Sequence, residues 1–448
     1  MISKYFLWAS VIVMNLLFLS SCLNSSDNNV EYSPDAQIYA FSLSSKADTS
    51  RLLPATAFTI DQVNGMIFNK EPLPFQFNVD SVVMNITGAN GYSPFSLVML
   101  LLVPDSSYAW VQSDSVALSR LLKITTTAPD GINSKIYHFR LNVYQQDPYL
   151  ITWENKTDNY IPSQADEQKT VVFNNRFITY YKSGTEIDAM TSVVADGVNW
   201  SKANLTGLPN SVRFSSLVVS GDLAFVLDEA TKKVYKSTDG IIWSQIATNY
   251  DVEAIYEVLP SASGGDILIT VNNNGSLMFA KSKDFSEIKL LNSVPGNIPI
   301  KDYSAAKVKN DLSFGVKYII LSGGYSADNN SNNDIFILQE KDGIITHITA
   351  RKPASVSLKG SRLFFYDNKP YMITASSEKN MLIYSDNFGL DWKKSADNQA
   401  FPAEFSYRTN ASVIVDANNY IWIFGGISST QDQIVDVWRG RLNKFALN

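Results

Sequence analysis

The chain holds many side chains that could do chemistry, but no spacing selects a catalytic set among them. Hydrolysis of a glycosidic bond needs two carboxyl groups about 5 to 10 Å apart, and no motif picks such a pair from the 43 Asp and Glu residues. Asp251 and Glu253 share one face of a predicted strand, as residues two apart do on any strand, which favours a solvated face. With two histidines in 448 residues, a zinc site is not expected. We therefore predict no catalytic residue and no metal centre.

One loop is rich in the oxygen ligands that calcium prefers. It runs Asp328-Asn329-Asn330-Ser331-Asn332-Asn333-Asp334. The loop lacks the glycine and the terminal glutamate of an EF-hand. A calcium ion is therefore one interpretation of residues 328–334, and a plain polar loop is the favoured one.

A short turn motif recurs through the second half of the chain and indicates the elements that must carry any site. Its clearest copies are residues 195–200, 237–243 and 385–392, with fainter copies near Asp284 and Asp342. Successive copies are about one four-stranded β-propeller blade apart. We predict an all-β protein in which residues 148–448 form a six-bladed β-propeller. The predicted blades are residues 168–206, 211–248, 252–292, 300–349, 356–396 and 405–445.

The last predicted blade lacks its outer strand. A propeller must close to hide its sheet edges. Residues 149–153 are therefore predicted to supply that strand beside residues 436–442.

The recurring motif resembles the Asp-box of sialidases and related propellers, in which an acidic or amide side chain hydrogen-bonds the backbone of the turn between the third and fourth strands. The resemblance implies structural rather than catalytic roles, in which glycine permits a positive φ and tryptophans pack between blades. The positions concerned are Asp196, Trp200, Asp239, Trp243, Asn387 and Trp392. The copies at Asp196 and Asp239 are one residue shorter than the usual spacing. Two other blades look kelch-like, because the glycine pairs 323–324 and 425–426 follow apolar strands.

Topology predicts a binding face even without a catalytic motif. In a propeller the loops between second and third strands surround the mouth of the central channel, away from the Asp-box turns. The candidate ligand rim formed by these loops comprises Glu186, Asp228, Asn273, Asp328, Glu378 and Asp432. This predicted rim is polar and mostly acidic.

Residues 34–147 are predicted to form an immunoglobulin-like β-sandwich. Apolar residues alternate at Phe75, Phe77 and Val79 and again over residues 137–143, as in half-buried strands. Turn signals such as residues 64–65 separate strands that are short enough for a sandwich. The boundary is placed at residues 147–148, because a residue before proline avoids helical geometry and proline cannot join a central ladder.

The N-terminus predicts export and lipid attachment. Residues 1–21 read as a lipoprotein signal peptide, with Lys4 before a short apolar run. The run ends in Leu19-Ser20-Ser21-Cys22, which looks like a bacterial lipobox. Cys22 is the only cysteine of the chain and would carry the lipid, with residues 22–33 as a flexible tether. We expect an outer-membrane lipoprotein, on the inner leaflet or the cell surface, that touches the membrane through its lipid alone.

The net charge of the chain and its resemblance to a known family limit the functions that we expect. A net charge of −6 argues against nucleic acid as a partner. Residues 58–61, 68–74 and 142–148, with Cys22, resemble a Bacteroidetes-type family of uncharacterised lipoproteins with an immunoglobulin-like domain and a C-terminal propeller. We expect a non-catalytic envelope lipoprotein whose propeller binds a glycan or an envelope protein. The alternative hypothesis is a glycoside hydrolase with an unrecognised carboxylate pair in the propeller pocket.

Overall fold

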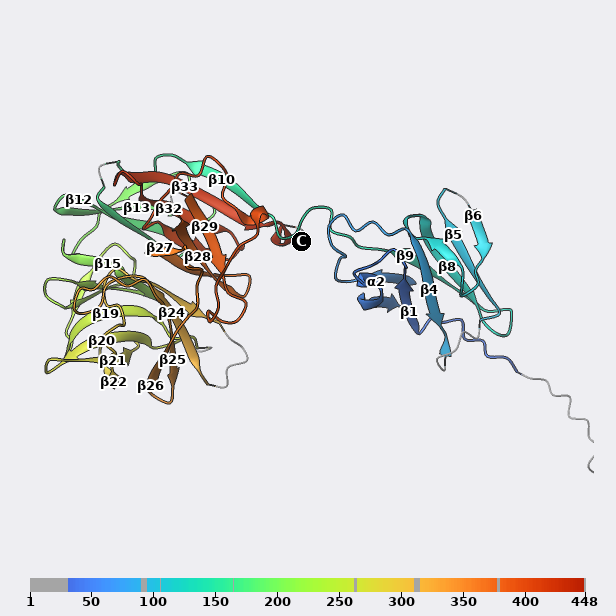
Figure 1. Ribbon diagram of the computed structural model, residues 1–448, viewed down its shortest axis with the longest axis horizontal. Coiled ribbons are helices and arrows are strands. Elements are labelled where there is room, and N and C mark those ends of the chain that lie inside the picture. Colours follow the sequence, from blue (N-terminus) through green and yellow to red (C-terminus); the bar gives the residue numbers. More distant parts are fainter. Residues whose placement is uncertain are drawn as a thin grey trace, which may run out of the picture. The chain divides into compact units, whose positions relative to one another are not determined.

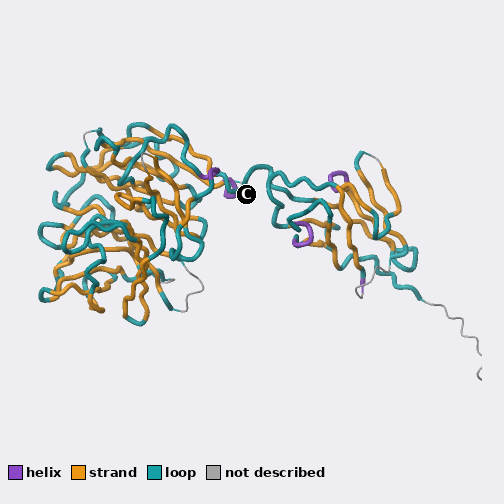
Figure 2. Tube along the Cα trace, viewed as in Figure 1, coloured by secondary structure: helices purple, strands orange, loops and turns teal. Residues whose placement is uncertain are grey.

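The structure, a computed structural model, describes residues 31–89, 95–104, 106–163, 165–261, 264–309, 315–376 and 379–446. The predicted signal peptide and Cys22 lie outside these residues. The chain divides into two compact units, Met1–Asp147 and Pro148–Asn448. Regular structure in both is almost entirely β-strand (Figure 2). Among the described residues the helical elements include α2 (Leu52–Ala55) and 3₁₀ turns at Leu118–Arg120, Asp397–Gln399 and Asn443–Phe445.

The N-terminal domain consists of two sheets around one apolar core. The smaller has the order β1 (Ala40–Ser44), β4 (Ser81–Thr87), β7 (Ser115–Ala117). The larger has the order β2 (Phe58–Asp61), β3 (Met66–Asn69), β9 (Ser134–Arg140), β8 (Leu121–Thr127), β5 (Leu97–Leu102), β6 (Ser106–Ala109). Only β3 and β9 are parallel among these pairs. Side chains alternate between buried and exposed along β4 and β9, because one face of each sheet covers the core.

The strand predicted through Phe75, Phe77 and Val79 is wrong. Residues 74–80 carry no strand, and the Phe77 N–H donates to the carbonyl of Pro74 at 3.0 Å within a turn. Gln76 has a φ of 62°, which a strand does not allow. Prolines on both sides of Leu73 prevent continuous ladder pairing. Phe77 and Val79 nevertheless pack against the core, so their apolar character reports burial rather than a strand.

The C-terminal domain contains six four-stranded antiparallel sheets among the described residues. In chain order five of them are β11 (Glu167–Phe173) to β14 (Ser201–Ala203), β15 (Val212–Ser220) to β18 (Ser244–Ile246), β19 (Asp251–Val258) to β22 (Lys289–Ser293), β23 (Ser304–Val308) to β26 (Ile344–Thr349), and β27 (Ser357–Tyr366) to β30 (Lys393–Lys394). Their inner strands are β12 (Arg176–Ser183), β13 (Glu186–Val193), β16 (Leu223–Asp228), β17 (Val234–Ser237), β20 (Ile267–Asn273), β21 (Ser276–Ser282), β24 (Lys317–Ser322), β25 (Ile335–Lys341), β28 (Lys369–Ser376) and β29 (Lys379–Tyr384). The sixth sheet has the order β10 (Ile151–Thr157), β33 (Gln433–Leu442), β32 (Ile421–Ile427), β31 (Ser412–Val415).

Sequence explains why the sheets stack face to face. Second strands such as β32 and β20 are rich in apolar residues and are buried on both faces along most of their length. Apolar clusters fill the spaces between successive sheets, and one of them joins the last sheet to the first. There Phe177 of β12 lies 5.0 Å from Trp422 and 4.9 Å from Phe424 of β32, between ring centroids. The first strands contact one another in the order β11, β15, β19, β23, β27, β31 and back to β11.

The outer strand of the sixth sheet comes from the start of the domain. β10 lies antiparallel to β33, with Ile151 opposite Leu442 and Trp153 opposite Gly440 (Figure 1). The sequence analysis placed residues 149–153 at this position, and the strand in the structure is Ile151–Thr157. The first and last strands of the domain therefore share one sheet.

Candidate functional site

A cavity of about 800 Å³ lies among the first strands of the six sheets. Residues of β11, β15, β19, β23, β27 and β31 line it. These strands surround the cavity because they contact one another in a closed succession. A cavity of this volume falls in the range of small-molecule sites.

Three charged residues that line the cavity have shifted pKa values. Lys169 lies on β11, Glu257 on β19 and Arg362 on β27, and all three line the cavity. Each strand also contains apolar residues close by, such as Val171 in β11 and Leu363 in β27. Each side chain is half-buried, because it faces the cavity rather than the space between sheets.

Lys169 has the most unusual environment of the three. Burial, reinforced by the nearby positive charge of Arg362, lowers the pKa of Lys169 to about 8, against a weaker opposing effect of Glu257. No hydrogen bond or ion pair to a described residue engages its ammonium group. The ammonium group is therefore available to a molecule in the cavity.

Arg362 is held in place by the neighbouring strand. Its Nε donates to the carbonyl of Ala411 at 3.0 Å, and its Nη2 donates to Oδ1 of Asn410 at 3.1 Å. Its Nη1 donates to the carbonyl of Ser361 at 2.9 Å. Burial lowers the pKa of Arg362 to about 10, so the group stays protonated at neutral pH. A fixed guanidinium with unused N–H donors suits recognition of an oxyanion.

Glu257 is an acidic residue of the same cavity. Burial raises the pKa of its carboxyl group, and Lys307, the Val258 N–H and Lys169 only partly offset that increase. The Val258 N–H donates to Oε1 of Glu257 at 2.8 Å. The attraction of Glu257 raises the pKa of Lys169, but it does not offset the effect of burial on that group.

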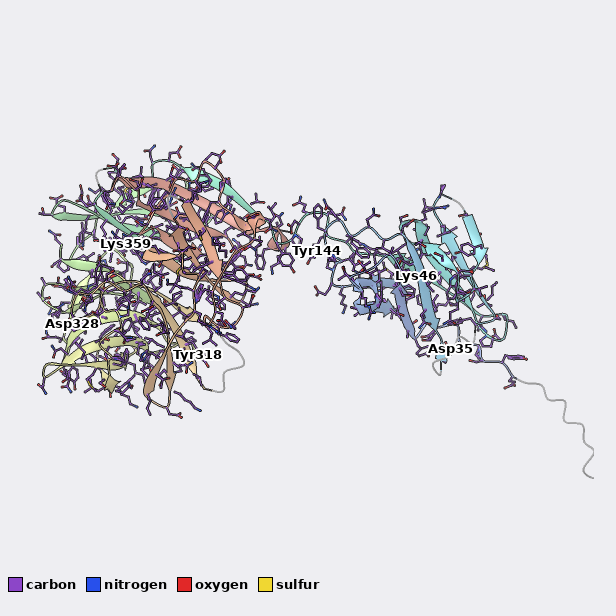
Figure 3. All side chains as sticks on the ribbon, in the orientation of Figure 1. Asp35, Lys46, Tyr144, Tyr318, Asp328 and Lys359 are labelled. Carbon is purple, nitrogen blue, oxygen red and sulfur yellow. The ribbon has the colours of Figure 1, made fainter. Side chains whose placement is uncertain are left out.

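Further charges line the cavity near the starts of the first strands. They include Asp166, Glu167, Asp302 and Lys359; Lys359 is labelled in Figure 3. Glu167 accepts a hydrogen bond from Nζ of Lys182 at 2.9 Å. The hydroxyl and amide groups of Tyr325, Ser331, Asn332, Asn410 and Gln433 also line the cavity.

None of the predicted rim residues that the structure describes lines this cavity. Glu186, Asp328 and Asp432 are exposed, and Asn273 is half-buried at the end of β20. Asp228 is buried, and its carboxylate accepts hydrogen bonds from Ser211, Thr231 and the Ala230 N–H. Glu378 lies outside the described residues. The loops between second and third strands reach the cavity through other residues, among them Tyr325, Ser331 and Asn332.

The side chains of the recurring turn motif make local contacts, and none lines the cavity. Asp239 Oδ1 accepts N–H groups of Ile241 and Ile242, both at 2.8 Å. Asn387 Oδ1 accepts the Asp391 N–H at 2.9 Å, and Asp196 Oδ2 accepts the Asn199 N–H at 3.1 Å. Trp243 and Trp392 are buried in cores between sheets, and Trp200 packs edge-on against Tyr160 at 5.3 Å.

In the oxygen-rich loop at residues 328–334, the side-chain amides of Asn332 and Asn333 form hydrogen bonds with other parts of the protein. Asn332 Nδ2 donates to the carbonyl of Asn297 at 2.9 Å, and Asn333 Oδ1 accepts the Leu358 N–H at 2.9 Å. Across the described part of the chain, no three His, Cys, Asp or Glu side chains gather as a metal site would require. Nor do the described residues include a helix with the length and apolar composition of a membrane span.

One feature of the sequence could have indicated the three charged cavity residues, which were not predicted. Lys169, Glu257 and Arg362 each place a charge in a strand that also contains an apolar run, at residues 171–173, 254–256 and 363–366. A charged side chain inside such a strand needs either a buried partner or a water-filled space. That signal could have directed attention to the first strands rather than to the loops.

Two family descriptions cover most of the chain. Residues 147–448 match the DUF6242 beta propeller domain. Residues 36–141 match the N-terminal domain of the same family, described as a domain of unknown function. No curated protein sequence matches the chain.

Solved structures share only a general likeness with the chain. The structure titled YjhT is 11% identical with a TM-score of 0.43, covering 62% of this chain and 95% of its own. An inactive virginiamycin B lyase from Staphylococcus aureus with quinupristin is 12% identical, with a TM-score of 0.39 and coverages of 65% and 99%. A mutant Trypanosoma rangeli sialidase with trans-sialidase activity is 10% identical, with a TM-score of 0.40 and coverages of 66% and 60%. At these values none of the three supports a statement about function.

Proposed function

The chain belongs to the DUF6242 family, and we propose that this member is a non-catalytic envelope lipoprotein whose propeller binds an acidic glycan in its central cavity. In this proposal the six sheets are the six blades of one closed ring. The N-terminal domain is an immunoglobulin-like spacer, and Cys22 carries the lipid of a Bacteroidetes-type outer-membrane lipoprotein. The Asp-box-like and kelch-like turns serve only to hold the blades together.

The observation that carries the proposal is the free ammonium group of Lys169 beside Arg362. Two cations that have lost part of their hydration in one cavity repel each other, and burial already lowers the pKa of both. An anionic group between them would replace the lost hydration and remove the repulsion. Burial disfavours the charged form of Glu257, the carboxyl group that shares this cavity with the two cations.

The remaining wall suits a sugar rather than an apolar molecule. Side-chain groups of Ser331, Asn410 and Gln433 can exchange hydrogen bonds with sugar hydroxyls, whereas the Asn332 amide is already bonded to Asn297. Phe364 and Phe365 also line the cavity, but Phe364 is buried and both rings pack into cores between sheets. An acidic monosaccharide or disaccharide matches the pair of cations, Lys169 and Arg362, and the polar groups of the wall.

The first test is calorimetric titration of the chain from Leu23 onward with uronic-acid oligosaccharides and their neutral, carboxyl-reduced counterparts. The acidic sugars should bind and raise the melting temperature, whereas the neutral sugars should not. Lys169→Met should abolish the binding. Lys341→Met is the matched control, because Lys341 is exposed at the end of β25. Equal binding of acidic and neutral sugars, or unchanged binding by Lys169→Met, would contradict the proposal.

One observation favours glycoside hydrolysis as the second candidate. Glu257, whose carboxyl group has a raised pKa, shares the cavity with the carboxyl groups of Glu167 and Asp302. A general acid with a raised pKa and a second carboxylate are the components of a glycosidase. If a bound acidic oligosaccharide is shortened by the native chain but not by Glu257→Gln, the protein is an enzyme.

A further inference from the structure

Aliphatic side chains protrude from one end of the larger sheet of the N-terminal domain. Val63, in the turn between β2 and β3, is 92% exposed, and Ile132, in the turn between β8 and β9, is 83% exposed. Val111 follows β6 and is 62% exposed, and Leu97 begins β5 and is also exposed. We call these four residues the aliphatic tip.

Strand pairing places the aliphatic tip at a single end of the sheet. Leu97 pairs with Thr127, and Thr127 pairs with Ser134. Leu97 and the turn with Ile132 therefore lie at the same end of the strands. The Trp110 N–H donates to the carbonyl of Val98 at 2.8 Å, which brings Val111 to the same level. β3 and β9 are parallel neighbours, so the turn with Val63 precedes β3 at this end too.

Two turns of the tip are held by the same hydrogen-bond pattern. Oδ1 of Asp61 accepts the N–H groups of Val63 and Asn64, at 2.9 and 3.0 Å. Oδ1 of Asp130 accepts the N–H groups of Ile132 and Asn133, at 2.8 and 3.0 Å. Hydrogen bonds therefore fix the backbone of each turn, while its aliphatic side chain, Val63 or Ile132, stays exposed to water. Transfer of such apolar surface out of water is favourable.

The chain enters the domain at this same end. The Asp130 N–H donates to the carbonyl of Ser33 at 3.4 Å, and Thr126 Oγ1 donates to the carbonyl of Ala36 at 2.6 Å. Asp35, labelled in Figure 3, lies in this entering segment. Residues 22–33 span at most on the order of 40 Å when fully extended. A lipid on Cys22 would thus keep the aliphatic tip within reach of the bilayer.

We propose that the aliphatic tip docks onto the lipid bilayer and inserts its side chains at the boundary between headgroups and acyl chains. The inference rests on the proposed lipid anchor at Cys22. Exposed Tyr32 and Tyr39 belong to the entering segment, and tyrosine favours this boundary. Asp61, Asp114 and Asp130 surround the tip with carboxylates, which limits the depth of insertion and disfavours anionic lipids. The anchor and the tip together give two points of membrane contact, which departs from the expectation from the sequence that the lipid alone touches the membrane.

The test uses the lipidated full-length protein on phosphatidylcholine vesicles. The thiol of Cys22 is blocked by the lipid and is the only native one, so Ile132→Cys can be labelled uniquely with a polarity-sensitive fluorophore. Leu122→Cys is the matched control, because Leu122 is an exposed aliphatic residue near the opposite end of β8. The label at residue 132 should shift to the blue and be quenched by lipid-borne quenchers, whereas the label at residue 122 should not. Anionic lipid in the vesicles should reduce the shift.

Each other outcome contradicts a defined part of the argument. Protein that stays in the aqueous fraction contradicts the lipid anchor, and the inference fails with it. Protein that sediments with the vesicles while residues 132 and 122 report equal polarity contradicts the tip alone, and that end then faces water or a protein partner. A shift that grows with anionic lipid would indicate adsorption by charge and would overturn the insertion of aliphatic side chains.

Discussion

Arg408 and Asp436 form a two-point ion pair inside the propeller, with Nη2 of Arg408 2.9 Å from Oδ2 of Asp436. The Arg408 side chain is fully buried and stacks over Phe405, 4.1 Å from the ring centroid. Nε1 of Trp438 donates to Oδ2 of Asp436 at 3.0 Å. The pair joins β33 to the segment that leads into β31.

Removing the charge of Asp436 should destabilise the propeller strongly. Asp436→Asn leaves the buried guanidinium of Arg408 without a counter-charge, at a cost of about 3 to 5 kcal/mol. Urea denaturation of both proteins measures the difference. Asp432→Asn is the control, because Asp432 is exposed and its replacement should change the free energy of unfolding little. Equal effects of the two substitutions would show that the pair contributes no more than a surface charge.

Asp239→Ala should cost about 1 to 2 kcal/mol, because two turn N–H groups lose their acceptor. Asp239→Asn should cost less, since Asn387 fills the same role in another blade. Burial opposes ionisation of Asp239, but hydrogen bonds from Ile242, Ile241 and Ser237 prevail and lower its pKa. The stabilising effect of its charge is therefore present above the unfolded pKa and is lost as the pH falls through the folded pKa, below about pH 4.

The measurement for this turn is the free energy of unfolding from pH 3 to pH 7. The difference between wild type and Asp239→Asn should shrink at the acid end. Asn387→Ala supplies the comparison, since an amide does not titrate and its cost should not depend on pH. A cost of Asp239→Asn that is constant with pH would contradict the assigned cause.

Lys169→Met should stabilise the protein while it abolishes ligand binding. The folded pKa of about 8 lies below the ordinary value of 10.5, so between these values the unfolded chain binds more protons. Wild-type stability should therefore rise as the pH increases from 8 to 10.5, and the variant should lack this rise. Binding of an acidic sugar should weaken over the same range, as the ammonium group loses its proton. A variant less stable than wild type at pH 7 would indicate that Lys169 has an internal partner.

Glu257→Gln should raise the melting temperature at neutral pH. Burial raises the pKa of Glu257 above 4.5, so the folded state holds the proton more tightly than the unfolded chain. Wild-type stability should decline as the pH rises from 4.5 through the raised pKa, and the variant should not show this decline. Melting curves from pH 4 to pH 8 measure the difference. Parallel curves for the two proteins would mean that Glu257 titrates normally.

Gly440→Ala should weaken the sheet that closes the propeller. A Cβ at this position would overlap the indole ring of Trp153 on the paired strand, and overpacking of this kind costs about 1 to 3 kcal/mol. Gly296→Ala is the control, because no atom lies within 4 Å of its added Cβ. Adding Trp153→Val to Gly440→Ala should recover part of the loss, which a double-mutant cycle measures. Additive effects would contradict direct overlap.

Local patterns predicted much of the fold because they report burial and turn chemistry. The repeat around Asp239 and Asn387 and the apolar second strands correspond to four-stranded sheets. The same reasoning failed at Phe75, because alternation alone cannot reveal that Gln76 has a positive φ. The local sequence therefore predicts which side chains of a segment are buried better than it predicts the backbone conformation of that segment.

The cavity residues could not be deduced in the same way. Lys169 and Arg362 are 193 positions apart in the sequence and meet only because their strands contact others in a closed succession. A loop residue such as Asp228 looks equally polar in the sequence, yet its carboxylate is occupied by Ser211 and Thr231. Which polar groups remain free depends on contacts between distant strands.

The pairing of β10 with β33 also has a consequence for biosynthesis. Thr152 and Asn443 form a hydrogen bond across 291 residues of sequence. During vectorial synthesis, the first strand of the propeller cannot pair with β33 until that final strand emerges. Contacts of such long sequence separation form slowly. The unfinished ring would present an open β-edge throughout that interval, so truncations of the last strand should aggregate rather than yield a smaller soluble propeller.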